Sequence, residues 1–160
     1  MIRRWVNRIR ASKKWVQALD LASRRQFEQA LGLVEAIEAL STRGSNPRPT
    51  KFSVDVDVLK ACLLSNLSRH EDALNLIVHL NSVFEGKTSI EKEYLEGYLS
   101  ELAHFVIYRS GLSAPRELEA LLQKDLNSID LKRVPRHLKR KFPLPAHPRW
   151  QGNGSAVTDG

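Results

Sequence analysis

Residues 18–31 read ALDLASRRQFEQAL, and residues 61–74 read ACLLSNLSRHEDAL. The two segments are 43 residues apart. When the chain is aligned with itself at this offset, both segments begin with alanine and end with Ala-Leu. The aligned alanines are Ala18 with Ala61 and Ala30 with Ala73. Two antiparallel helices that a tight turn joins approach closely only where their side chains are short. The pattern therefore predicts one helical hairpin that occurs twice.

The residues around these segments follow a helical period. Apolar residues recur at intervals of three and four, the spacing of one helix face, and no strand-like alternation competes convincingly. Two such stripes are Leu31, Val34, Ile37 and Leu40, and Leu74, Ile77, Leu80 and Phe84. We therefore expect an all-α fold. The expected helices are residues 2–11, 13–23, 25–41, 54–67, 69–84, 89–109 and 115–129.

The two quoted segments resemble the tetratricopeptide repeat, in which a small residue is followed by a turn glycine, an aromatic residue and Ala-Leu. Phe27 stands at the aromatic position of the first unit, whereas His70 replaces the aromatic residue of the second. Arg25 and Ser68 stand where the family has its turn glycine. The resemblance covers residues 13–84 and implies antiparallel helical hairpins stacked as a short array. Residues 89–129 would then form a divergent third hairpin, and another all-α bundle is the alternative fold.

Membership of that family would imply a protein-binding groove lined by the first helix of each hairpin. The register of the resemblance places these residues in the groove: Trp15, Leu19, Ala22, Val58, Cys62 and Asn66. Side chains with which some family members clamp a peptide carboxylate are absent from these positions, so an apolar or helical ligand is expected. Trp15 and Leu19 are accordingly expected to contribute more to partner binding than to folding.

Positive charge gathers at the two ends of the 160-residue chain, which has 25 Lys and Arg against 18 Asp and Glu. Residues 1–19 and residues 132–150 contain no acidic residue. Such basic segments face phosphate-rich partners or acidic protein surfaces. The expected contact residues are Arg3, Arg4, Arg8, Arg10, Lys132, Arg133, Arg136, Lys139, Arg140 and Lys141.

The chain divides into three parts by composition. Residues 1–12 are expected to form a basic amphipathic helix, because at about 100° per residue Ile2, Trp5, Val6 and Ile9 share one face. Such a helix either lies in the interface of an anionic membrane or packs on the first hairpin as a cap. Residues 13–130 form the helical-repeat domain. Residues 131–160 are a basic, proline-rich tail, expected to be disordered from about residue 151.

Few residues could support catalysis or metal binding. Cys62 is the only cysteine, so an internal disulfide and a thiolate zinc site are both excluded. Glycine-rich phosphate loops and the common hydrolase motifs are absent, and Glu101 with His104 is a single Glu-x-x-His pair where a di-iron bundle needs two. We therefore expect no enzymatic activity, no cofactor and no small-molecule substrate.

These features predict a non-enzymatic adaptor or scaffold that binds a protein while its basic ends engage an acidic surface. The alternative is a small nucleic-acid-associated protein, for example one bound to structured RNA. No segment has the roughly 20 apolar residues that cross a bilayer, and the single cysteine suits a reducing compartment. A cytoplasmic location is expected, with peripheral membrane attachment open. The Arg-rich, acid-free start also fits a mitochondrial transit peptide.

Overall fold

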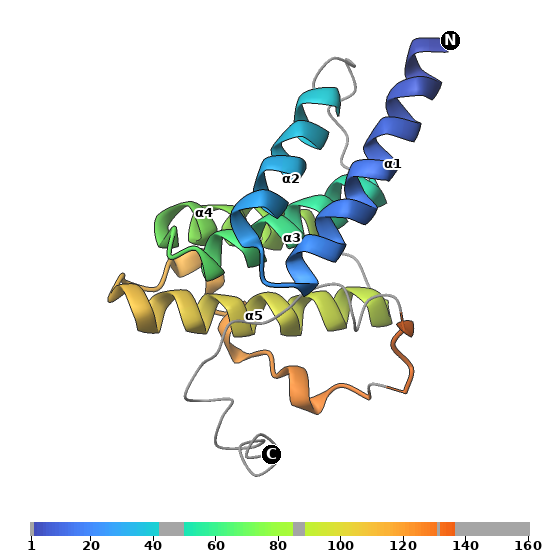
Figure 1. Cartoon of the computed structure of the whole chain (residues 1–160). Coiled ribbons are helices and arrows are strands. Elements are labelled where there is room, and N and C mark those ends of the chain that lie inside the picture. The colour runs from blue at the N-terminus through green and yellow to red at the C-terminus, as the bar shows by residue number, and fades with distance from the viewer. Residues whose placement is uncertain (1, 42–49, 85–88, 131, 137–160) are drawn as a thin grey trace, which may run out of the picture.

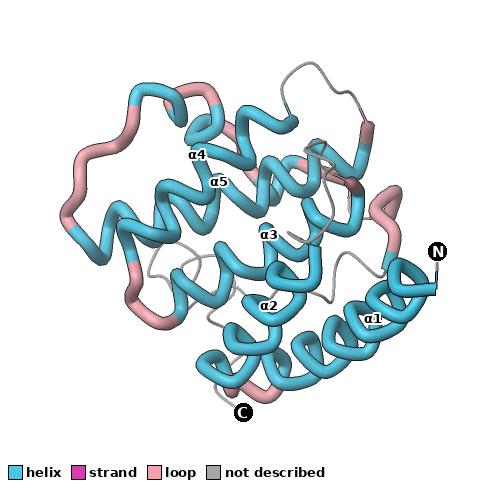
Figure 2. The backbone as a smooth tube through the Cα atoms, turned by 90° about the horizontal axis from the view of Figure 1, so that it is seen from above, coloured by secondary structure: helices cyan, strands magenta, loops and turns pink. Residues whose placement is uncertain are grey.

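The computed structural model describes residues 2–41, 50–84, 89–130 and 132–136, in which helices and loops are the only elements (Figure 1). The α-helices are α1 (Ile2–Ser23), α2 (Phe27–Ser41), α3 (Lys51–Asn66), α4 (His70–Phe84) and α5 (Ile90–Ser110). Three 3-10 turns follow: η1 (Arg116–Leu118), η2 (Leu121–Gln123) and η3 (Leu126–Ser128). Neighbouring helices pack in sequence order from α1 at one edge of the molecule (Figure 2). The predicted all-α class is confirmed.

The turn between α1 and α2 and the turn between α3 and α4 have the same backbone conformation. Each contains a residue with a φ of 60°, Arg25 in the first turn and Ser68 in the second. That residue donates its N–H to a carbonyl three residues back, and the next residue donates to a carbonyl five back, which is the Schellman arrangement. The hydrogen bonds are Arg25 to Ala22 at 3.0 Å, Gln26 to Leu21 at 2.9 Å, Ser68 to Ser65 at 3.4 Å and Arg69 to Leu64 at 3.0 Å. The 43-residue register of the sequence thus reappears in the backbone.

Alanine occupies two matching, fully buried positions in each hairpin. Ala18 and Ala30 of the first hairpin and Ala61 and Ala73 of the second have no exposed surface. A larger side chain at any of them would need space that a close-packed interior does not have.

The two hairpins meet through contacts between α3 and the first hairpin. The Trp15 ring of α1 lies edge-on to the Phe52 ring of α3, with centroids 5.7 Å apart. On the α2 side, Nζ of Lys60 lies 2.9 Å from a carboxylate oxygen of Glu38, and both side chains are partly buried. This aromatic contact and this ion pair add to the apolar packing between the hairpins.

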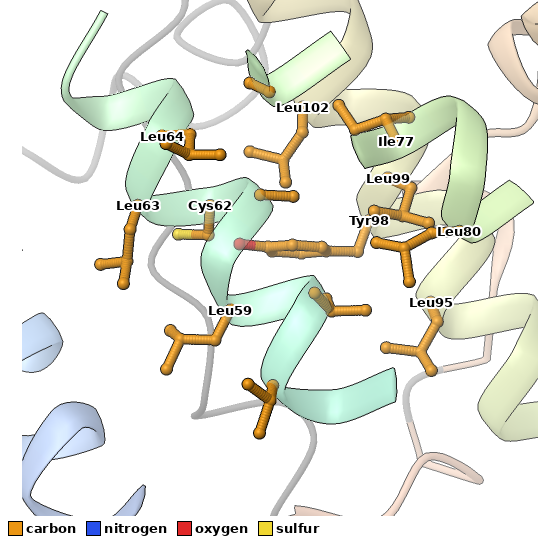
Figure 3. Packing of buried hydrophobic residues seen from close by; sticks show 14 of the residues in the cluster. Leu59, Cys62, Leu63, Leu64, Ile77, Leu80, Leu95, Tyr98, Leu99 and Leu102 are labelled. Atoms are coloured by element: carbon orange, nitrogen blue, oxygen red, sulfur yellow. The ribbon is translucent and has the colours of Figure 1, made fainter. Parts of the chain in front are cut away.

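α5 is the interior helix of the second half of the fold. It is buried on most of its circumference, unlike an amphipathic surface helix. Its buried residues are Tyr94, Leu95, Gly97, Tyr98, Leu99, Ser100, Glu101, Leu102, Ala103, Phe105 and Val106. Tyr98 and Leu102 extend toward α3, and the Tyr98 ring reaches Cys62 (Figure 3).

The predicted helix break at Ser12 is absent, because α1 is continuous from Ile2 to Ser23. Neither glycine nor proline occurs between residues 2 and 23 to interrupt the backbone hydrogen bonds. The buried face also continues through the expected break, since Ala11 lies one turn before Trp15. One helix therefore contains both the predicted helix 2–11 and the predicted helix 13–23.

The helix predicted at 115–129 is also wrong, because this segment forms three 3-10 turns. Glu119 and Ala120, which join the first two turns, have helical dihedral angles, whereas Lys124 and Asp125, which join the last two, are extended. Local side-chain hydrogen bonds compete with helix formation here. The Asp125 carboxylate accepts the N–H of Asn127 at 2.9 Å, and the Ser128 hydroxyl donates to the Asp125 carbonyl at 2.7 Å. Residues 115–129 therefore form a strap on α4 and α5, and the expected third hairpin is not present.

The helix predicted to begin at residue 54 begins three residues earlier. Thr50 caps α3, because its hydroxyl accepts the N–H of Ser53 at 3.1 Å and the Ser53 hydroxyl accepts the N–H of Thr50 at 2.8 Å. This reciprocal capping box uses serine where glutamate is more common.

Gly97→Ala is expected to destabilise the fold at the contact between α5 and the strap. The added Cβ would lie 3.0 Å from Cδ1 of Ile129 and 3.1 Å from Cα of Leu126. Overpacking costs about 1–3 kcal/mol, and the helix-propensity gain of about 1 kcal/mol offsets only part of it. We expect a urea melt to show a net loss of about 1 kcal/mol. Gly32→Ala is the matched control: it has open space around it and should be stabilising, so two variants of the same sign would contradict the packing.

Ser68→Gly is expected to stabilise the second hairpin. Glycine adopts a φ of 60° without a Cβ clash, so the substitution should raise the free energy of unfolding by about 0.5–1 kcal/mol. Ser68→Ala keeps the clash and should give no gain. Equal stability of the glycine and alanine variants in urea would show that this turn carries no strain.

Candidate functional site

α1 has an exposed row of large apolar side chains on its outward face. Ile2 is 80% exposed, Trp5 66%, Ile9 37% and Val16 66%. At 3.6 residues per turn the four lie within an arc of about 60°. These four residues are the outer stripe. Their spacing of three, four and seven residues matches the a and d positions of a heptad.

The opposite face of α1 attaches the helix to the body. Ala11, Trp15, Ala18 and Ala22 are buried there. Because this face is held by the core, the outer stripe points away from the rest of the described chain, and α1 lies along one edge of the molecule (Figure 2). The stripe is therefore presented on a helix of fixed orientation.

Cations border the outer stripe, and the first acidic residue of α1 is Asp20. Asp20 already lies 3.3 Å from the guanidinium of Arg24. None of the cations that precede it is within ion-pair distance of a carboxylate in the described part of the chain. These cations are Arg3, Arg4, Arg8, Arg10, Lys13 and Lys14. A shallow depression at the start of the helix is lined by Ile2, Arg4, Trp5 and Arg8. The site thus combines an apolar centre with nearby cations and with no acidic side chain on α1 before Asp20.

The residues predicted to line a partner groove lie in or beside the core. Trp15, Ala22, Val58 and Cys62 are buried. Leu19 and Asn66 are half-buried, and Nδ2 of Asn66 donates to the Cys62 carbonyl at 2.9 Å. The chain's own residues cover the buried four, so a partner would reach them only if the packing opened. A groove at these residues stays a prediction.

Cys62 and Tyr98 form a neutral pair inside the core. The Tyr98 hydroxyl lies beside the Cys62 sulfur (Figure 3). Burial raises the pKa of the Cys62 thiol to about 12, and burial, followed by the neighbouring Cys62, raises the pKa of Tyr98 well above its ordinary value. The thiol is therefore protonated at neutral pH, and the reactive thiolate form is suppressed.

Glu101 and His104 lie where α5 meets the strap and the core. Nε2 of His104 donates to the Leu122 carbonyl at 2.8 Å and so ties α5 to the strap, while Glu101 is buried in α5. Among the residues the structure describes, no group of three or more His, Cys, Asp or Glu is placed to hold a metal ion.

A second, open depression lies where the start of α4 meets the end of α5. Its lining residues are Arg69, His70, Glu71, Asp72, Arg109, Ser110 and Leu112. Both positive and negative side chains line it, and Arg69 is already paired with Asp72 at 3.0 Å. This depression has neither the single sign of charge nor the apolar centre of the α1 site.

The tail cations are only partly described. Lys132, Arg133 and Arg136 are exposed beyond η3. Lys139, Arg140 and Lys141, and the expected disorder from about residue 151, lie outside the described residues. No helix in the described ranges is long and apolar enough to cross a membrane.

Sequence reasoning found three of the four outer-stripe residues and missed Val16. The available signal was the seven-residue spacing of Ile2, Ile9 and Val16, which the expected break at Ser12 concealed. Val6, expected on the same face, is half-buried instead.

Comparison of the chain with protein families, with curated proteins and with solved structures finds no match. The tetratricopeptide resemblance therefore rests on the repeated hairpin alone. Five helices packed as adjacent pairs are established within the described residues, and no family is identified.

The reactivity of Cys62 tests whether the predicted groove is open. We expect a disulfide reagent that releases a coloured thiolate to label native protein slowly, at a rate that rises with urea as the fold opens. The physical reason is the burial of the thiol and its raised pKa of about 12. Cys62→Ala/Val16→Cys, with an exposed thiol on α1, should react at once as the control. Rapid labelling of native Cys62 would instead support an accessible groove.

Proposed function

We propose that this protein is a non-enzymatic adaptor or scaffold that attaches to an acidic surface through α1. The outer stripe of Ile2, Trp5, Ile9 and Val16, with nearby cations that have no carboxylate partner among the described residues, is the observation that carries the proposal. The helical hairpins would hold a protein partner, and α1 would place that complex on the acidic surface.

The α1 cations would attract an acidic partner, and the outer stripe would add apolar contact with it. Six cations without an intervening acid create a positive field along one helix, which accelerates the approach of an anionic partner and weakens with added salt. The exposed apolar side chains gain further free energy when a partner covers them, at roughly 25 cal/mol per Å². An acidic surface with apolar groups at its centre therefore fits this helix better than a purely hydrophilic one.

A nucleic-acid-associated role is the second candidate. It is favoured by the exposed cations Lys132, Arg133 and Arg136, which add to those of α1. Phosphate contacts would use the cations of both segments, but they would leave the aliphatic residues of the outer stripe without a partner. This mismatch is why the adaptor comes first.

Retention on heparin tests whether the α1 cations bind an acidic surface. Arg4→Gln/Arg8→Gln/Lys13→Gln should elute at clearly lower salt than the parent, because fewer counterions are released on binding. Arg109→Gln/Arg116→Gln/Arg133→Gln loses the same charge outside α1 and should elute later than the α1 variant. Equal elution of the two variants would overturn attachment through α1.

The adaptor role is tested by capture of partners with the tagged full-length chain from a nuclease-treated lysate. A protein that stays bound after nuclease supports the adaptor. If nuclease removed every partner, and the purified protein absorbed more strongly at the nucleic-acid maximum than at the protein maximum, the nucleic-acid role would be favoured instead.

A further inference from the structure

We propose that the acidic surface is an anionic phospholipid bilayer, on which α1 lies parallel to the membrane plane. This inference rests on the proposed attachment through α1 and names its partner. The outer stripe would enter the boundary between headgroups and acyl chains, and the flanking cations would stay at the level of the lipid phosphates.

The placement of α1 allows this contact without rearrangement. Trp15 and Ala18 hold its inner face in the core, so Ile2, Trp5 and Val16 already point outward. A bilayer can therefore meet the stripe along the helix axis while the hairpins stay on the side away from the lipid. Long cationic side chains can extend along the helix toward a charged plane.

A second copy of the chain does not fit the same stripe. In a heptad with Ile2, Ile9 and Val16 at a, Arg8 takes a g position and Lys13 takes the following e position. Parallel pairing of two copies would set Arg8 against Lys13 of the other copy, and antiparallel pairing would also set like charges together. Flanking charges of one sign oppose self-association.

The number of cations favours a plane over a single acidic helix. Only Arg8 and Lys13 border the seam closely enough for the e and g carboxylates of a partner helix. The other four cations, Arg3, Arg4, Arg10 and Lys14, lie farther around α1. A helix is about 10 Å across, and the screening length at physiological salt is about 8 Å. Arg3 and Arg10, about 110–130° around the helix from the centre of the stripe, can bend their long side chains toward a charged plane that extends past the helix, whereas a narrow partner helix would not reach them.

The depression at the start of α1 matches one lipid headgroup region. It is lined by two apolar side chains, Ile2 and Trp5, and by two guanidinium groups, Arg4 and Arg8. Guanidinium groups bind phosphate oxygens with paired hydrogen bonds. Indole rings are enriched at the membrane interface, where one edge is apolar and the other is wet.

Sedimentation with vesicles tests the inference on the full-length chain. We expect the parent to sediment with vesicles of equal phosphatidylcholine and phosphatidylserine, to release in high salt, and to stay in solution with phosphatidylcholine alone. Trp5→Ala and Arg4→Gln/Arg8→Gln should each partition about tenfold more weakly. Both substitutions are at exposed residues, and an unchanged melting temperature would verify that the variants fold.

Matched controls distinguish binding through the outer stripe from non-specific adsorption to vesicles. Tyr108 is 63% exposed, close to Trp5, but it lies at the end of α5. Tyr108→Ala should bind vesicles as the parent does, and so should Arg116→Gln/Arg133→Gln. Binding that ignores lipid charge, or that is equal in Trp5→Ala and the parent, would overturn the inference.

Tryptophan fluorescence reports whether Trp5 enters the acyl-chain region, which adsorption to the headgroups alone would not achieve. Vesicles with bromine-labelled acyl chains should quench the Trp150→Phe chain, and the quenching should disappear when Trp5→Phe is added. Retention on heparin without vesicle binding, but with binding to an acidic amphipathic peptide, would overturn the membrane partner and leave the proposed function standing. If, in addition, the α1 variant and its matched control eluted from heparin at the same salt concentration, both the membrane partner and the proposed function would be overturned.

Discussion

Close packing at small side chains holds each hairpin together, and the direction of every exposed face follows from it. Ala18 and Ala30 are fully buried in the first hairpin, as are Ala61 and Ala73 in the second. With these positions inside, the 3.6-residue period decides which other residues lie outside. The outward direction of Trp5 is thus a consequence of the buried Ala18, almost four turns further along the same helix.

The two hairpins tolerate local strain in order to keep their turns short. Arg25 and Ser68 adopt a left-handed conformation that glycine would adopt more easily. In return, the Schellman hydrogen bonds satisfy carbonyls at the ends of α1 and α3. At Arg25 the guanidinium also lies 5.5 Å from the centre of the Phe27 ring, a cation–π contact that glycine could not make.

Charged groups at the junction of the hairpins are partly sheltered from water. Burial, followed by the nearby carboxylate of Glu38, raises the pKa of Asp57, while His79 and Lys60 act in the opposite direction. Lys60 bridges this junction through its ion pair with Glu38. By contrast, the cations before Asp20 in α1 have no such partner among the described residues, so they can attract an acidic partner.

The all-α class, the register of the repeated hairpin and the basic character of α1 could be predicted from the sequence, because helical periodicity, alanine spacing and charge are local properties. The continuity of α1 across Ser12 and the 3-10 strap at residues 115–129 could not. In α1 the continuous buried face outweighed a weak capping signal, and in the strap the side chains of Asp125 and Ser128 outcompeted helical hydrogen bonds. Only the tertiary structure decided that Trp15 is buried and Trp5 exposed. Both are tryptophans on one helix, and α2 and α3 cover one face of that helix and leave the other to solvent.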